Sequence, residues 1–233
     1  SSAGCGSSSS DNAGKTDQTK QTANVQDSQK DESSDSKPDN DKKDAKYKSA
    51  DEITMDDLMS HDETPAEDFE FNDGRDDIII DKYVGKDPIV VIPDEIDGKK
   101  VVDFDKTFWN NKIVVAIRVG NNVTEIKKMA FSNCENLKYV VLGESVKSLG
   151  SDSFANTNIK EIELNDGLQK IGEDDTNNTV DAPDSNYGMD LKIPDSVTEI
   201  HVRHFNLIVK SGSQAEQYAK DFADSNNLTY TVE

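Results

Sequence analysis

The chain has 233 residues, which is enough for one or two ordinary domains. Its 47 Asp and Glu against 26 Lys and Arg give a formal net charge of −21, which argues against DNA, RNA or an anionic membrane surface as a partner, because each phosphate contact needs a cation. Hydrophobic residues make up only 33%, and no run of about 18 apolar residues is present to span a bilayer.

Cys5 follows the small residues Ser2-Ala3-Gly4 and precedes Gly6 and a run of serines. This stretch resembles the processing site of bacterial lipoproteins, in which the cysteine sulfur is acylated. The resemblance implies a lipid anchor at Cys5 on the outer face of the bacterial cell membrane, and no other contact with a membrane. The alternative is a cysteine in a polar tail that carries no lipid.

Residues 1–50 contain almost nothing that could build a core, since Val25 and Tyr47 are their only large apolar residues. Such a segment cannot bury enough apolar surface to offset the entropy lost on ordering. We therefore predict that residues 1–65 form a disordered tether rich in serine and acidic residues, in which "EITMDDLMS" forms a short helix at most. Residues 66–233 are predicted to form the folded domain.

The stretch "DFEFNDGRDDIIIDKYVG" opens that domain. It predicts a β-hairpin whose turn is Asn72-Asp73-Gly74. Ile78 to Ile80 would then pair onto the first coil of the domain, which contains Ile92, and shield its edge.

A repeat occupies the middle of the chain. Four sets of residues recur 22–29 positions apart, with Thr176 in place of the aromatic residue in the third copy: Val119, Leu142, Leu164 and Ile193; Val123, Val146, Leu168 and Val197; Ile126, Leu149, Ile171 and Ile200; Phe131, Phe154 and Phe205. A looser first copy has Ile92, Val101 and Phe104, with Phe108 or Trp109 in the aromatic position. A period of 20–29 residues predicts a solenoid, and the short alternating runs within each copy predict a parallel strand ladder.

The segments "IPDEIDGKKV", "VTEIKKMAFSNCENL" and "LKIPDSVTEI" resemble the BspA-type leucine-rich repeats of bacterial surface proteins, over residues 69–233. The resemblance implies a right-handed leucine-rich repeat solenoid of stacked 22–29-residue coils. It also implies an extracellular location and a role in adhesion or partner binding, with no catalytic activity.

The third copy runs into an acidic insertion, residues 173–190. Its Asp and Asn oxygens are of the kind that calcium prefers, although the spacing fits no known calcium loop. A calcium site, a partner site and a plain solvated loop all stay open for this segment.

The chain ends with features typical of a cap. Leu207 to Val209 predicts a further strand, and "SQAEQYAKDFADS" predicts a helix with capping-box spacing between Ser213 and Glu216. The apolar side of that helix is formed by Ala215, Tyr218, Ala219 and Phe222. A closing strand is predicted in "NNLTYTVE".

The sequence gives no sign of catalysis. His61, His201 and His204 lack a zinc-like spacing to further ligands, and Cys134 is expected to be a small buried apolar residue. No P-loop, dinucleotide fingerprint or G-x-S-x-G motif is present. We expect no enzyme activity, metal or cofactor.

The outward side of the predicted ladder is the candidate binding face. Exposed apolar residues beside an arginine suit a protein or peptide partner better than charge alone. The face comprises Val91, Arg118, Tyr139, Val141, Glu161, Glu163 and Lys192. The favoured function is a lipid-anchored, non-enzymatic binding or adhesion module, and the alternative is a structural or assembly component of the bacterial envelope.

Overall fold

The computed structural model describes residues 46–72, 76–173 and 179–233. The chain separates into two units, residues 1–42 and 43–233, and every described residue belongs to the second unit. No helix in that part is long and apolar enough to cross a membrane. The same residues contain no group of three or more His, Cys, Asp or Glu placed to hold a metal ion.

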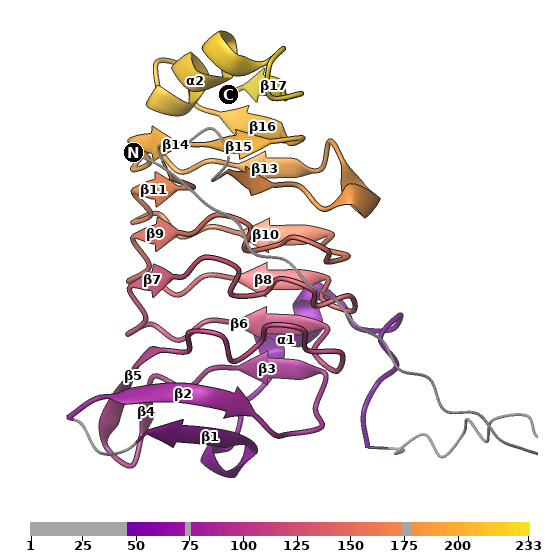
Figure 1. Ribbon diagram of the computed structural model, residues 1–233, viewed down its shortest axis with the longest axis vertical. Helices are drawn as coiled ribbons and strands as arrows, with labels where there is room; N and C mark the ends of the chain where they lie inside the picture. The colour runs from indigo at the N-terminus through magenta and orange to yellow at the C-terminus, as the bar shows by residue number, and fades with distance from the viewer. Residues whose placement is uncertain (1–45, 73–75, 174–178) are drawn as a thin grey trace, which may run out of the picture. The chain divides into compact units, whose positions relative to one another are not determined.

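The second unit is a parallel β-solenoid, as the repeat predicts (Figure 1). One sheet, called the ladder below, takes one strand from each of four successive coils: β3 (Ile89–Val91), β6 (Ala116–Arg118), β8 (Tyr139–Val141) and β10 (Glu161–Glu163). A second parallel sheet runs along another side: β7 (Glu125–Ile126), β9 (Ser148–Leu149), β11 (Lys170–Ile171) and β14 (Glu199–Ile200). The leucine-rich repeat architecture is thereby confirmed.

The repeated apolar residues form one core between these sheets, because each coil buries its inner face against the coils on both sides. The middle residues of the ladder strands pair in register and point inward: Val90, Ile117, Val140 and Ile162. Phenylalanines pack in a column beside them, with the rings of Phe131 and Phe154 stacked at 5.8 Å. In the first copy both Phe104 and Phe108 are buried, whereas Trp109 is 49% exposed. The aromatic position therefore belongs to Phe108.

Side-chain amides link the backbone of successive coils. Turns leave carbonyl groups without a strand partner, and a buried or half-buried carbonyl needs a donor. Asparagines supply it at one corner after another, donating to a carbonyl one coil earlier: Asn122 to Asp94, Asn136 to Lys112, Asn158 to Glu135 and Asn186 to Ile159. These bonds run along the solenoid axis and hold the coils in register.

The predicted hairpin caps the first coil. After η1 (Ala66–Asp68), β1 (Phe69–Asn72) pairs antiparallel with β2 (Ile78–Tyr83). The predicted turn at Asp73 and Gly74 lies outside the described residues. β2 then pairs in parallel with β5 (Lys99–Asp103), as expected for Ile78 to Ile80, and β5 pairs antiparallel with β4 (Glu95–Ile96).

The folded unit begins earlier than the sequence predicts. Residues 46–65, assigned above to the tether, belong to the solenoid unit and contain α1 (Met55–Ser60). The side chain of Thr54 accepts a hydrogen bond from the backbone N–H of Asp57, and the Asp57 carboxylate accepts from the backbone N–H of Thr54. The boundary at residue 65 is wrong because Ile53 and Leu58 suffice to hold this segment against the coils, where both are buried.

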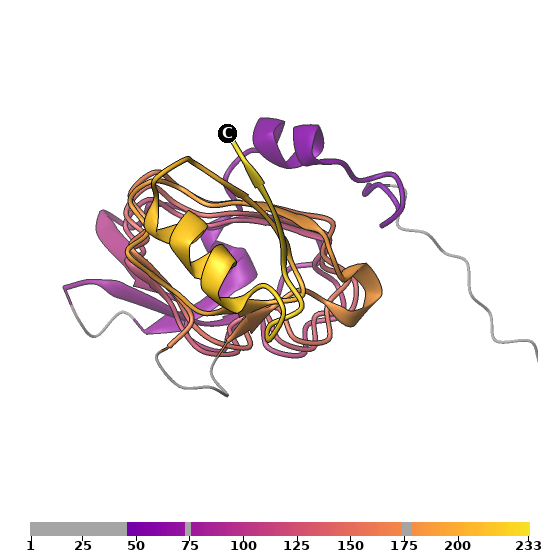
Figure 2. The ribbon, with the colours of Figure 1, turned by 90° about the horizontal axis from the view of Figure 1, so that it is seen from above.

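The last coils are irregular and end in a cap. β12 (Val180–Asp181) pairs with β15 (Val202–Arg203), and η2 (Asp184–Asn186) follows β12. A three-stranded parallel sheet, β13 (Asp190–Lys192), β16 (Asn206–Val209) and β17 (Thr229–Val232), continues beyond β10. α2 (Gln214–Phe222) lies across the end of the coils (Figure 2). Its buried residues are Ala215 and Ala219, and Tyr218 packs beside them against the core. Phe222 is 45% exposed, and its ring lies 4.9 Å from that of Tyr218.

Candidate functional site

The outward residues of the ladder align as the sequence predicts. Val91, Arg118, Val141 and Glu163 are paired in one row across β3, β6, β8 and β10. Ile89, Ala116, Tyr139 and Glu161 form the neighbouring row. Lys192 belongs to the next sheet, on β13, which packs beside β10. The register of the candidate binding face is therefore correct.

The first half of this face is covered by the chain itself. Residues 46–64, called the strap below, place Ile53 and Leu58 on the outward side chains of β3 and β6. Val91 and Val141, predicted to lie on the open face, are only 3% and 9% exposed. Their exposure was wrongly predicted, because the sequence pattern gives the side of the strand on which a residue lies and not what packs there. Seen along the coils, α1 lies outside their outline (Figure 2).

Polar contacts hold both ends of the strap. At its start, the Lys138 ammonium donates to the carbonyl of Ala50 and to the carboxylate of Asp51, both at 2.8 Å. This hydrogen bond lowers the pKa of Asp51. At its end, Thr64 exchanges two bonds with the backbone of Val91, each of 2.9 Å, through its own N–H and its hydroxyl.

Arg118 lies between these two sets of contacts, and its guanidinium group has an incomplete set of hydrogen-bond acceptors. Its Nη2 donates to the carbonyl oxygen of His61 at 3.2 Å. Its Nε is buried and has no hydrogen-bond partner among the described residues. A buried donor without a partner costs about 1–3 kcal/mol, so this guanidinium group has an unused capacity for an acceptor.

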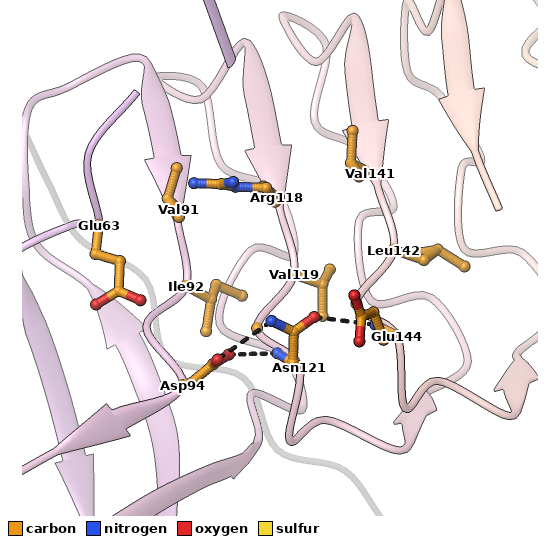
Figure 3. A pocket seen from close by; sticks show the side chains of 12 residues that line it. Glu63, Val91, Ile92, Asp94, Arg118, Val119, Asn121, Val141, Leu142 and Glu144 are labelled. Atoms are coloured by element: carbon orange, nitrogen blue, oxygen red, sulfur yellow. Dashed lines mark hydrogen bonds between the residues drawn. The ribbon is translucent and has the colours of Figure 1, made fainter. Parts of the chain in front are cut away.

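A pocket of about 270 Å³ opens beside Arg118 at the carboxyl ends of β3, β6 and β8 (Figure 3). The Asp94 carboxylate accepts from the backbone N–H and the side-chain amide of Asn121, at 2.5 and 3.2 Å. The side-chain Oδ1 of Asn121 accepts in turn from the backbone N–H of Glu144 at 3.1 Å. The carboxylate of Glu63 lines the same pocket and points away from the guanidinium group (Figure 3). Sequence reasoning missed this pocket, because its turn residues lie outside the alternating strand pattern.

The second half of the face is open and polar. Glu161, Glu163, Asp190 and Lys192 are all exposed. A chain of hydrogen bonds crosses β13, β16 and β17, since Asn206 donates to Asp190 at 2.6 Å and Thr229 donates to Asn206 at 2.8 Å. Tyr139 is half-buried at the junction between the covered half and the open half.

The two C-terminal histidines and Cys134 each make contacts with other residues of the fold. His201 lies 3.8 Å from Glu199, and His204 stacks on Tyr187 at 4.1 Å, so the two histidines are engaged separately. Cys134 is buried, as expected, and its thiol donates to the Phe108 carbonyl; burial raises its pKa to about 11. Cys5 and residues 174–178 of the acidic insertion lie outside the described residues.

Residues 104–180 match the family model of the BspA-type leucine-rich repeat region, in six copies. Among solved structures, the T. pallidum leucine-rich repeat protein TpLRR is 28% identical with a TM-score of 0.53, and the match covers 63% of this chain and 71% of that one. A leucine-rich repeat protein from Bacteroides ovatus is 21% identical (TM-score 0.46; 63% of this chain, 40% of that one). A leucine-rich cell surface protein from Faecalibacterium prausnitzii is 22% identical (TM-score 0.36; 62% and 52%). No curated protein matches the sequence.

Proposed function

We propose that the chain is a non-enzymatic protein-binding module of a bacterial cell surface, because residues 104–180 match the BspA-type leucine-rich repeat region. Solenoids of this kind bind partners along extended faces that no single coil could form alone. In this proposal Cys5 carries a lipid anchor, and the polar residues after it hold the repeat region away from the membrane.

The observation that carries the proposal is the open half of the candidate binding face. Glu161, Glu163 and Lys192 are exposed on neighbouring strands of the unit, next to the half-buried Tyr139. A partner laid across these strands would meet charges of both signs and an aromatic anchor. Tyrosine is enriched among binding hot spots, because its side chain buries much area and also makes polar contacts.

A charge-reversal pair tests this face. Glu161→Lys with Glu163→Lys changes two exposed carboxylates of the ladder, and Glu125→Lys with Asp166→Lys makes the same charge change elsewhere on the surface. Immobilised chains would be exposed to host matrix proteins and to bacterial envelope fractions. We expect the first variant to lose at least about tenfold in the amount of partner retained, and the control to retain as much as the unmodified chain.

The same experiment separates the alternative. Partner binding that survives Glu161→Lys with Glu163→Lys would show that the open half is not the site. Retention of envelope components alone, whichever variant is used, would favour a structural or assembly role in the envelope.

A further inference from the structure

The strap packs on a hydrophobic cluster separate from the core of the repeats. Ile53 and Leu58 join Ile89, Val91, Val115, Ala116 and Val141 on the outer side of the ladder. The main core lies on the inner side and continues through all the coils. The strap therefore packs on the outside of the ladder and is not part of the solenoid core. Its removal would expose an apolar surface without exposing that core.

The strap is also a poor element by itself. α1 has six residues, and isolated helices shorter than about 12–15 residues are marginal in water even with good capping. It therefore depends on two buried aliphatic side chains and the few polar contacts described above. Elements held by so few contacts open at a lower free energy than the fold around them.

We propose that the strap is a displaceable pseudoligand, which covers a second docking site for an acidic segment of a partner protein. The site lies on β3, β6 and β8. The partner segment would place two aliphatic side chains there, spaced like Ile53 and Leu58, and carboxylates that pair with Lys138 and Arg118. This proposal rests on the proposed binding function and names the chemistry of the partner.

Two basic side chains specify the charge of that partner. Lys138, with a side chain only 12% exposed, holds the strap's own Asp51. Arg118 donates one hydrogen bond to a carbonyl oxygen of the strap, and its buried Nε donates to no acceptor among the described residues. Ion-paired hydrogen bonds between a carboxylate and a guanidinium group are about twice as strong as neutral ones. A partner that brings a carboxylate to Arg118 would gain a contact that the strap does not make.

The test uses the full chain and a synthetic probe. The variant Ile53→Ser with Leu58→Ser removes the two anchors of the strap, and a labelled peptide of residues 46–63 serves as the probe in fluorescence polarisation. We expect the double variant to bind this peptide at least about tenfold more tightly than the unmodified chain, whose own strap competes. The matched control is Met59→Ser, since Met59 is 47% exposed on the same helix, and it should behave as the unmodified chain does.

Two changes in the probe examine the chemistry. The peptide with serine at positions 53 and 58 should not bind, and the peptide with Asp51→Asn should bind several-fold more weakly to the double variant. Equal binding of the Asp51→Asn peptide would remove the charge requirement at Lys138. Equal affinity of the double variant and the unmodified chain for the original peptide would overturn the proposal.

A second measurement needs no substitution that could unfold the chain. In the unmodified protein, the N–H of Leu58, which donates to Thr54 within the strap, should exchange with solvent through an opening that leaves the β8 amides protected. Exchange of both at one common rate would show that the strap is part of the core and would overturn the proposal. Neither result would bear on Glu161 and Glu163, so the proposed function is tested independently.

Discussion

Gly143 and Gly120 show how closely successive coils approach at one corner of the solenoid. A Cβ added to Gly143 would lie 2.3 Å from the carbonyl oxygen of Gly120 and 2.8 Å from that of Val119. Both obstacles are backbone atoms, which cannot rotate away as a flexible side chain can. Glycine is thus required at position 143 for steric reasons, because the backbone of the preceding coil occupies the space of a side chain.

This contact predicts the effect of a single methyl group. Gly143→Ala should lower the free energy of unfolding by about 1–3 kcal/mol, because the added methyl forces two coils apart. Gly167→Ala is the control, since its Cβ would meet the flexible end of Lys147 at 2.8 Å and no backbone atom closer than 3.4 Å. Urea unfolding of both variants gives the comparison. An equal loss of unfolding free energy in the two variants would mean that the backbone at this corner moves as easily as the Lys147 side chain.

At the scale of the element, α1 shows how a weak amphipathic segment becomes part of a fold. Its capping box supplies two hydrogen bonds at the N-terminus, which sets where the helix begins. The helix remains folded because Leu58 in the helix and Ile53, which precedes the helix, are buried against the ladder. Burying such a side chain contributes about 1.5–3 kcal/mol, which is enough to hold a short segment but not to build a core.

Limited proteolysis measures this packing. Since residues 46–64 are packed on the ladder, we expect the resistant fragment of the unmodified chain to begin between residues 43 and 50. In the variant Ile53→Ser with Leu58→Ser it should begin near residue 66, because the strap no longer protects its own backbone. Mass spectrometry of the fragments identifies the ends. A fragment that begins near residue 66 in the unmodified chain would mean that the strap is open most of the time.

At the scale of the whole molecule, the chain divides by composition. Residues 1–42 form a separate unit, and residues 43–233 contain the repeats with the hairpin at one end and α2 with β17 at the other. A solenoid needs both ends closed, since its terminal coils would otherwise expose the core. The proposed role of the long polar segment is to separate the repeats from an anchor at Cys5.

The anchor gives a prediction of its own. When the chain is produced in bacteria behind a lipoprotein signal, Cys5→Ser should abolish labelling with a fatty-acid analogue and move the protein from the membrane to the soluble fraction. Serine has no sulfur to acylate, and the unit of residues 43–233 should keep its melting temperature. Ser2→Ala, a change outside the acceptor, is the control. A Cys5→Ser protein that stays in the membrane fraction would refute the lipid anchor.

The sequence by itself determined the repeat and the inward and outward sides of each strand, because these depend on periods of two and of 22–29 residues. It also determined the two caps, because a hairpin turn and a helix-capping pattern are local signals. Lys138, Arg118 and Ile53 show where that reasoning stops. The bonds of Arg118 to His61 and of Lys138 to Ala50 join residues 57 and 88 positions apart, and the packing of Ile53 on the ladder likewise follows no period. Only the tertiary structure therefore shows that residues 46–64 cover half of the ladder. A pattern of alternation records which side chains avoid water, and it does not distinguish a surface open to a partner from one that the chain covers with two aliphatic residues of its own.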